Sequence, residues 1–382
     1  MGITVIPKER DEITDLSRLE IKFDRGELES PSRFITKVDI NAKDGIGADI
    51  PLSRTRKLFM YEEFVNPNTI DNILNKNGYL ATFITNFQNF LLRVERSDAL
   101  RLVYPKFTKA GLETLESLGE SNRNKVWQFI FEAFHELSYG KAAIDGFYLQ
   151  YDHLTDAGKR YALTQNLPFV PVIDIHEDIR VVKREMNDYM NMSSSLVPFI
   201  GLTYSTKTRS NLAYNQAISV LDSLHETGKG FITVESPRTS GRWSEDPDVS
   251  ALHYSSFIVA DLTAERAYGG GSSGEPNLRL FEKGDLAAPP LDHRHNAAEH
   301  VDELSALNGD KKLQEFLGRM IGGMDNLSEA DKRRAPYLSR VHENIVTGSE
   351  YENMRRSIIS NELLRYRAEK KRLNQMLVGE GR

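Results

Sequence analysis

Acidic side chains stand at or near the ends of short apolar segments in the middle of this sequence. Asp174 ends the run "LPFVPVID", Glu235 lies near the end of "GKGFITVES", and Asp261 ends "HYSSFIVAD". Carboxylates that meet in one site of low dielectric constant move each other's pKa values apart, which yields an acid and a base at neutral pH, or a carboxylate nucleophile. We therefore predict catalytic roles for these three residues, although acids that follow strands also commonly cap helices.

Further polar side chains lie close to the same segments. His176 follows Asp174 by two residues, and the stretch "YSTKTRSN" contains Tyr204, Lys207 and Arg209. Helix N-termini near the open end of a barrel bind anionic groups, and basic loop residues there can assist. We predict that these four residues contact the substrate, while a Lys/Arg pair in a loop is also commonly no more than solvated.

A histidine-rich segment offers a different chemistry. "DHRHNAAEH" contains His293, His295 and His300, and imidazole together with carboxylate ligands suits zinc or manganese. The spacing departs from both HExxH and HxxEH, and the preceding "LAAPPL" does not have the pattern of an apolar strand. The segment favours a solvated helix start, so we predict no metal and no other cofactor. A metal-dependent hydrolase that uses the three histidines stays as an alternative.

The composition limits the classes of chemistry. The 382 residues include no cysteine, which excludes disulfides, thiolate nucleophiles and iron–sulfur clusters. No apolar run of about 18 residues predicts a membrane span, and the first residues lack the apolar core of a signal peptide, so we expect a cytoplasmic protein. The net charge is −6, yet residues 328–382 hold twelve Lys or Arg against eight Asp or Glu. That asymmetry leaves room for a locally basic surface.

Four apolar segments in the middle of the chain predict strands of a parallel sheet. Each is rich in Val, Ile and Phe and nearly continuous, as is typical of strands that are buried on both faces. The stretches 176–192 and 211–228 between them have apolar residues at helical spacing. The four segments are 167–174, 196–205, 228–236 and 253–261.

The first half of the chain is consistent with the same alternation of strands and helices. Its patterns predict strands at 33–40, 79–87 and 141–152, and helices at 55–65, 69–78 and 124–138; the stretch 96–119 is ambiguous. Strands that alternate with helices favour an α/β protein built as a closed (β/α)₈ TIM-type barrel. An open doubly wound sheet is the alternative, but no dinucleotide-binding glycine pattern supports it.

We predict that the barrel spans residues 25–290, between an N-terminal segment (1–24) and a helical C-terminal region (291–382). Within that region, residues 351–377 predict one long helix with a basic side. This side could contact the phosphate backbone of a nucleic acid, and a merely solvated helix face is the alternative. The basic residues in question are Arg355, Arg356, Arg365, Arg367, Lys370 and Lys371.

Two segments resemble the tRNA-guanine transglycosylase family, including its DNA-modifying relatives. "RGELESPSRFIT" (25–36) is similar to the family's N-terminal pattern, in which a hairpin leads through Thr/Ser-Pro into the first barrel strand, and residues 196–236 resemble a later strand–loop–helix–strand segment. Members of the family are (β/α)₈ barrels that exchange guanine for a 7-deazaguanine with an aspartate nucleophile and an aspartate base. The family's Asp-Ser-Gly-Gly-Phe-Gln signature and its cysteine-rich zinc site are absent. "IDGFYLQYD" echoes the signature and puts Asp145 in the catalytic place.

The resemblance and the carboxylates together predict a transglycosylase-like barrel enzyme. It would act on a nucleobase or glycosidic bond in RNA or DNA by base exchange. Asp145 or Asp174 would attack the sugar carbon, and Asp261 or Glu235 would serve as the partner carboxylate. A non-catalytic barrel that binds or assembles with a partner is the alternative, because a barrel can keep its strands without a catalytic motif. The binding partner could also be a small nucleobase-like molecule, another protein or a second copy of this chain.

Overall fold

A computed structural model describes residues 2–12, 14, 16–46, 58–93, 98–139, 143–149, 154–164, 168–175, 179–204, 229–235, 261–263, 280–286, 315, 319 and 328–379. Within these residues, nine parallel strand segments form one sheet in the order β4-β12-β11-β10-β9-β8-β7-β6-β5. The segments are β4 (Ser32–Arg33), β5 (Ile35–Thr36), β6 (Leu58–Val65), β7 (Leu100–Phe107), β8 (Gly146–Leu149), β9 (Phe169–Ile175), β10 (Phe199–Tyr204), β11 (Gly230–Glu235) and β12 (Leu262–Thr263).

The two outermost segments of this sheet are consecutive in the chain, so the sheet closes on itself. β4 pairs with β12, and β5 pairs with β6. Phe34, which lies between β4 and β5, donates its N–H to the carbonyl of Thr263 (2.8 Å). β4 and β5 therefore act as one strand, and the nine segments make the eight strands of a TIM-type barrel. The predicted fold class is confirmed.

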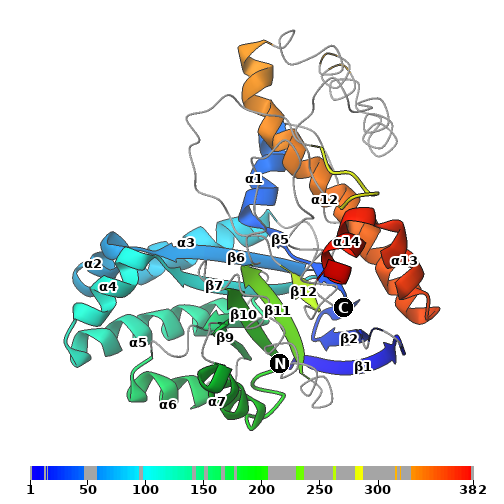
Figure 1. Cartoon of the computed structure of the whole chain (residues 1–382). Helices are drawn as coiled ribbons and strands as arrows, with labels where there is room; N and C mark the ends of the chain where they lie inside the picture. The colour runs from blue at the N-terminus through cyan, green and yellow to red at the C-terminus, as the bar shows by residue number, and fades with distance from the viewer. Residues whose placement is uncertain are drawn as a thin grey trace.

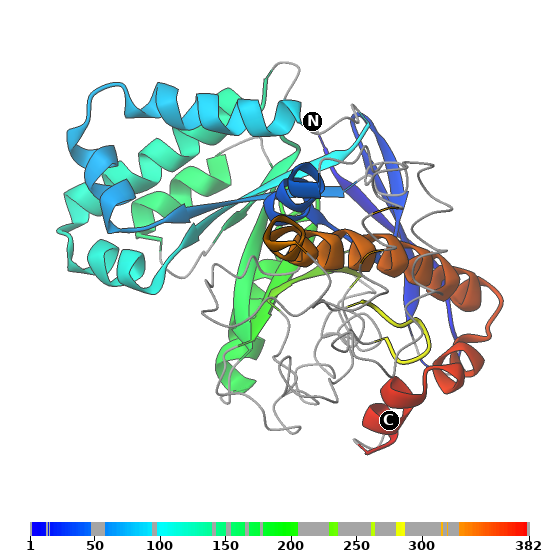
Figure 2. The same ribbon diagram turned by 90° about the horizontal axis from the view of Figure 1, so that it is seen from above.

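Helices pack around the barrel (Figure 1). Seen from above, α2 to α6 gather on one side of the molecule and α12 to α14 on the other (Figure 2). The helices are α1 (Lys37–Ile46), α2 (Pro67–Asn75), α3 (Tyr79–Leu92), α4 (Lys109–Ser117), α5 (Glu120–Leu137), α6 (Asp156–Thr164), α7 (Ile179–Met190), α12 (Glu329–Ile359), α13 (Leu363–Glu369) and α14 (Lys371–Gly379).

The strands are buried on both faces because the side chains of each strand alternate between two apolar clusters. On β6, Leu58 and Met60 belong to the cluster that fills the barrel, whereas Phe59 and Tyr61 join the layer between strands and helices. Alternation with a period of two is the rule for a strand. The next side chain of β6 that faces the inside of the barrel is therefore that of Glu62.

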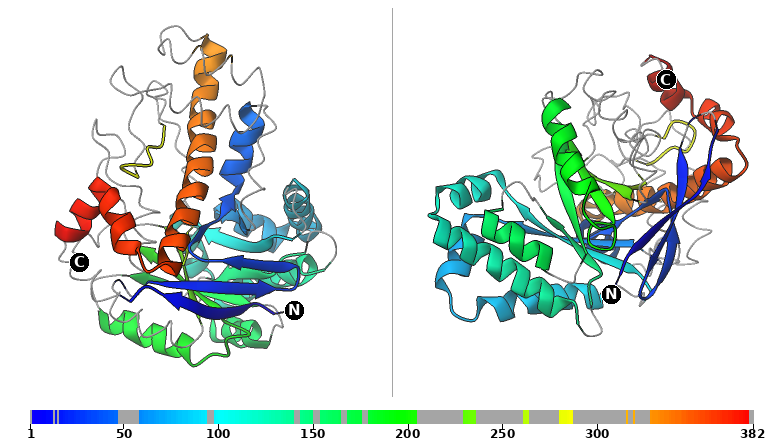
Figure 3. Two further views of the ribbon diagram at one scale, coloured as in Figure 1. Left: turned by 90° about the vertical axis from the view of Figure 1, so that its right-hand side faces the viewer. Right: turned by 90° about the horizontal axis from the view of Figure 1, so that it is seen from below.

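A small antiparallel sheet covers the amino-terminal end of the barrel. It consists of β1 (Thr4–Arg10), β2 (Ser17–Phe23) and β3 (Gly26–Glu29). Its residue Leu19 is part of the barrel's inner cluster and lies against the start of β11, where a Cβ on Gly230 would come within 3.3 Å of the leucine side chain. Figure 3 shows this sheet at the foot of α1 and α12, which stand side by side. The predicted N-terminal segment is therefore part of the packed structure.

Several predicted elements are confirmed and others are wrong. The strands predicted at 167–174, 196–205 and 228–236 match β9, β10 and β11, and the stretch 69–78 contains most of α2. The stretch 79–87 is helical, since α3 buries Phe83, Phe87 and Phe90 at helical spacing. The stretch 55–65, predicted as a helix, contains strand β6. Both errors come from aromatic-rich sequence, which fits a buried helix as well as a strand.

The predicted long C-terminal helix is in fact broken. α12 ends at Ile359, where Asn361 takes a left-handed backbone conformation with φ of 56°, and a second break separates α13 from α14 at Lys370. A positive φ cannot continue a right-handed helix, so the chain turns there. The region is helical, as predicted, but α12 packs directly on α1 and β4 and thus belongs to the barrel wall.

Candidate functional site

Two of the predicted acidic residues stand at the same level of the backbone at the carboxyl end of the barrel, on strands β9 and β11, which both pair with β10. In the backbone register, Thr203 of β10 is opposite Asp174 of β9 on one side and Glu235 of β11 on the other. The carboxyl ends of barrel strands are where barrel enzymes carry their active sites. The pairing brings the backbones of these two acids to within two strand spacings, about 10 Å.

Four buried polar residues line the inside of the barrel on the adjoining strands β6, β7 and β8. We call Glu62, Tyr104, Lys106 and Tyr148 the inner polar cluster. Glu62 is opposite Tyr104 in the strand register, and both follow inner apolar positions on their strands. Glu62 is 5% exposed and Lys106 is 6% exposed. Charged residues are seldom buried to this extent without a structural or functional reason.

Close contacts tie the members of the inner polar cluster together. The Tyr104 and Tyr148 rings lie with centroids 5.4 Å apart and are tilted by 44°. The Lys106 ammonium lies 5.7 Å from the centre of the Tyr104 ring, within the range of a cation–π contact. Burial, together with the nearby Tyr104 and Glu62, raises the pKa of Tyr148 well above its ordinary value, so its hydroxyl stays protonated and able to donate.

The Tyr148 hydroxyl is fully buried and has no hydrogen-bond partner among the residues that the structure describes. Gly201 of β10 makes room for the ring, because a Cβ at that position would lie 3.1 Å from the Tyr148 ring. A buried hydroxyl without a partner costs free energy and needs an explanation. At the inner end of a candidate site, a bound ligand is one such explanation.

The sequence patterns do not predict the inner polar cluster, because they do not place Glu62 or Lys106 on a strand. Glu62 lies in a stretch that was predicted to be a helix, and Lys106 lies in the stretch left ambiguous, so neither was assigned to a strand end. The signal that could have found them is the strand alternation itself. Leu58, Met60 and Glu62 occupy every second position of one strand, and an acid on the inner side near a strand's carboxyl end is a candidate for function.

Asp145 lies at the other end of the barrel from the position predicted for it. It precedes β8, and its carboxylate pairs with Arg25 and accepts the backbone N–H of Arg101 (2.7 Å). Arg25 also donates to the carbonyls of Ala99 (3.2 Å) and Ala143 (2.7 Å). These contacts fasten the β2–β3 turn to the amino-terminal ends of β7 and β8. Burial raises the pKa of Asp145 to about 6, against the lowering effect of Arg25.

Asp261 also lies at the amino-terminal end of the barrel. It was predicted to end a strand, but it precedes β12, which begins at Leu262. Its carboxylate accepts the N–H of Phe231 at the start of β11 (2.7 Å), and its carbonyl accepts the N–H of Ser32 (3.0 Å). These bonds join the first residues of three neighbouring strands, so the geometry gives this acid a role in closing the barrel.

The remaining predicted site residues divide between described and undescribed positions. Tyr204 is the last residue of β10 and lies opposite Ile175 in the register. His176, Lys207 and Arg209 lie outside the described residues, as do the three histidines at 293, 295 and 300. Among the residues that are described, no group of three or more acidic or histidine side chains is arranged to hold a metal ion.

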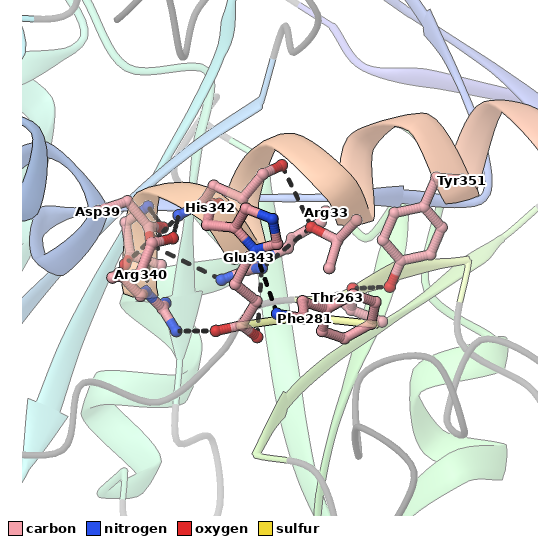
Figure 4. Close-up of polar contacts among 11 residues, drawn as sticks. Arg33, Asp39, Thr263, Phe281, Arg340, His342, Glu343 and Tyr351 are labelled. Carbon is pink, nitrogen blue, oxygen red and sulfur yellow. Dashed lines mark hydrogen bonds and ion pairs between the residues drawn. The ribbon is translucent and has the colours of Figure 1, made fainter. Parts of the chain in front are cut away.

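A buried ionic network fastens α12 to the barrel (Figure 4). The Asp39 carboxylate of α1 contacts Arg340 and, at 3.7 Å, Arg33 of β4. It also accepts the Thr36 N–H (2.8 Å) and the Asn344 amide (2.6 Å). Burial alone would raise the pKa of Asp39, but the two guanidinium groups and the hydrogen bonds hold it at about 2.

Further along α12, two more contacts reach across the point where the barrel closes. The hydroxyls of Tyr351 and Thr263 are 2.7 Å apart, and the His342 Nδ1 accepts the N–H of Phe281 (3.1 Å) (Figure 4). Arg33 is fully buried and lies 3.7 Å from Glu343. The network therefore balances positive and negative groups within the wall of the barrel, which is a structural role.

The predicted basic side of the C-terminal helix does not form a continuous surface. Arg355 donates to the carbonyl of Pro31 (2.6 Å), and Lys370 is buried against Glu350 (2.6 Å). The other four predicted residues differ in their surroundings. Arg367 donates to the Asn374 amide oxygen (3.2 Å), Arg356 and Arg365 are exposed beside acidic neighbours, and Lys371 is exposed.

Comparison of the chain with protein-family models and with curated protein sequences yields no match. Among the described residues, no helix is both long enough and apolar enough to span a membrane.

Proposed function

We propose that this chain is a barrel enzyme that acts on the bond between a nucleobase and a sugar by base exchange. The observation that supports the proposal most directly is the register of Asp174 and Glu235, which flank Thr203 at the carboxyl end of the barrel. Glu62 is buried inside the barrel on β6. Paired carboxylates are the groups with which most enzymes break glycosidic bonds.

In the proposed reaction, one carboxylate attacks C1′ of the nucleotide while the bond from C1′ to the base nitrogen breaks. The second carboxylic acid gives its proton to the departing base. An incoming base then attacks C1′, the ester bond to the first carboxylate breaks, and the second carboxylate takes up the proton of the new base. Asp174 and Glu235 are the pair we assign to these two roles. Backbones about 10 Å apart leave room for a sugar carbon between two carboxyl groups.

Asp145 and Asp261 are not part of this proposal, because both stand before their strands at the opposite end of the barrel. The aspartate that corresponds best to the transglycosylase signature therefore is not assigned as the nucleophile here. What remains of the resemblance is the barrel and the general reaction, with the carboxylates supplied by β9 and β11.

The direct test is base exchange with a labelled nucleobase. The purified chain is incubated with labelled guanine and either RNA or DNA, and the label that becomes covalently attached to the polymer is measured. Incorporation into either polymer is the expected result. If no label enters RNA or DNA, and no guanine is released from labelled polymer, the base-exchange proposal fails and the non-catalytic barrel becomes the better account.

A contact with nucleic acid would have to use the exposed basic residues of the C-terminal helices. Arg356, Arg365 and Lys371 are available, whereas Arg355 and Lys370 already make internal contacts. If the first three contact phosphates, their replacement by Gln should weaken binding and reduce the dependence of affinity on salt by about one unit of slope per lost contact. No binding by the unaltered chain at about 50 mM salt would contradict a polymeric substrate.

The histidine segment keeps the metal-dependent hydrolase as a separate hypothesis. Metal analysis of the purified protein tests it cheaply. Zinc or manganese near one equivalent, lost when His293 and His295 are replaced by Ala, would support it, and less than about a tenth of an equivalent would remove it.

A further inference from the structure

The inner polar cluster has hydrogen-bonding capacity that the proposed bond chemistry does not use. The two assigned carboxylates lie on β9 and β11, whereas the cluster lies on β6, β7 and β8. Glu62 can only accept hydrogen bonds when ionised, Lys106 can only donate, and the hydroxyls of Tyr104 and Tyr148 can do both. Glu62, Tyr104 and Lys106 also make contacts within the protein, so a ligand that joins them has to offer both hydrogen-bond donors and acceptors.

The Tyr148 hydroxyl is an independent sign of a ligand. It is completely buried, and no described residue hydrogen-bonds to it. Its ring is held between Tyr104, with centroids 5.4 Å apart, and the backbone of β10 at Gly201. The hydroxyl lies close enough to Glu62 for that carboxylate to raise the pKa of Tyr148.

The geometry of the two tyrosine rings argues against a flat nucleobase between them. A base stacked between two aromatic faces needs about 7 Å from ring to ring, twice the van der Waals separation of carbon atoms. The Tyr104 and Tyr148 centroids are only 5.4 Å apart, and the rings are tilted by 44°. The cluster thus offers polar groups without a stacking slot, which fits hydroxyl groups better than the face of a base.

We propose that the inner polar cluster binds the sugar of the substrate and selects a ribosyl group over a 2′-deoxyribosyl group. This inference rests on the proposed function. The 2′- and 3′-hydroxyls of a ribose donate to the Glu62 carboxylate and accept from the Lys106 ammonium or the Tyr148 hydroxyl. A deoxyribose lacks one of these groups, and a site built to hydrogen-bond a hydroxyl rejects the analogue that lacks it.

Binding of small probes tests this selection without any chemistry. The dissociation constants of guanosine, 2′-deoxyguanosine and D-ribose are measured by calorimetry for the unaltered chain and for Tyr148→Phe and Glu62→Gln. We expect guanosine to bind at least about tenfold more tightly than 2′-deoxyguanosine, which corresponds to about 1.4 kcal/mol, and both variants to lose most of that ratio. The matched controls Tyr139→Phe and Glu113→Gln, whose side chains are exposed, should keep it.

Equal affinity for the two nucleosides, or no binding of guanosine by the unaltered chain, would overturn the inference. Thermal unfolding gives a second readout that does not need a ligand. Tyr148→Phe should leave the melting temperature of the free protein unchanged or raise it, because the change removes a buried hydroxyl to which no described residue hydrogen-bonds. A fall of several degrees would mean that the hydroxyl is bonded within the protein, and the assignment to a ligand would be wrong.

The outcomes for the two proposals can be told apart. Base exchange at equal rates on RNA and DNA, with equal nucleoside affinities, defeats the sugar selection and leaves the proposed function standing. Selective binding of guanosine without any base exchange defeats the proposed function and supports the sugar site.

Discussion

Replacement of Asp39 by asparagine is expected to destabilise the fold by about 3–5 kcal/mol. The Asp39 side chain is fully buried, and its carboxylate contacts the guanidinium groups of Arg340 and Arg33. Asparagine keeps the size of the side chain but removes its charge, so Arg340 and Arg33 lose a buried acidic partner that they share. Removing one partner of a buried ion pair typically costs about 3–5 kcal/mol.

The lowered pKa of Asp39 gives a second estimate of how much its charge stabilises the fold. Its pKa is about 2 in the folded protein against an ordinary value of 3.8, because the two arginines and the hydrogen bonds outweigh the effect of burial. Since the folded pKa is the lower one, the stabilisation is present above about pH 4 and is lost as the pH falls through about 2. The difference between these two pKa values corresponds to about 2–3 kcal/mol, at about 1.4 kcal/mol per pKa unit.

The assay is urea-induced unfolding at pH 7 and at about pH 3, followed by tryptophan fluorescence, since Trp127 is buried in the outer core. The matched control is Asp44→Asn on the same helix. Asp44 pairs with Arg93, but these side chains are 56% and 39% exposed, so its loss should cost less than about 1 kcal/mol. If Asp39→Asn costs no more than Asp44→Asn at pH 7, the reasoning about the buried network is wrong.

Other substitutions test separate parts of the structure. Gly111→Ala should lower the free energy of unfolding by about 1–3 kcal/mol in a urea titration, because the new Cβ would meet a backbone oxygen of β6 at 2.2 Å. Gly119 has open space around it, so Gly119→Ala should cost less than about 1 kcal/mol. Equal losses in the two variants would contradict this prediction. Because burial raises the folded pKa of Asp145 to about 6, the contribution of Asp145 to stability should fall as the pH rises from about 4 to about 6. Asp145→Asn should remove that slope from a plot of melting temperature against pH. An unchanged slope in the variant would show that Asp145 is not the titrating group. Lys370→Gln should lower the melting temperature because it removes the ion-pair partner of the buried Glu350 carboxylate. Lys371 is exposed, so Lys371→Gln should leave the melting temperature unchanged. Equal melting temperatures in the two variants would show that the buried pair does not contribute to stability.

The sequence predicts the barrel best where strands are apolar on both faces. The segments that became β9, β10 and β11 are nearly continuous runs of Val, Ile, Leu and Phe, a pattern that arises when a strand is covered on both sides. β6 departs from this pattern because its inner face changes from Met60 to the buried Glu62. The aromatic residues of α3 suit a strand in isolation, and only packing against other helices decides for a helix.

The positions of the acids could be predicted only in part. Asp174 and Glu235 follow from the strand ends, because each stands at the carboxyl end of a run whose direction is fixed by the chain. The sequence pattern predicts Asp261 at the end of a strand, whereas β12 begins one residue after it. The pairing of β12 with β4 and β11 involves residues that are far from β12 in the sequence. Local patterns carry no information about such pairings, so sequence alone cannot decide which side of an acid becomes the strand.

We propose that the carboxylates at the carboxyl end of the barrel perform the chemistry, and that those at the amino-terminal end hold the structure. Base-exchange activity of four variants tests it in one experiment, with circular dichroism to confirm folding. Asp174→Asn and Glu235→Gln are predicted to lower the activity at least about 100-fold while the fold stays intact. Asp145→Asn and Asp261→Asn are predicted to leave the activity of the folded protein unchanged. Full activity in Asp174→Asn and Glu235→Gln, or selective loss of activity in stably folded Asp145→Asn or Asp261→Asn, would contradict the account.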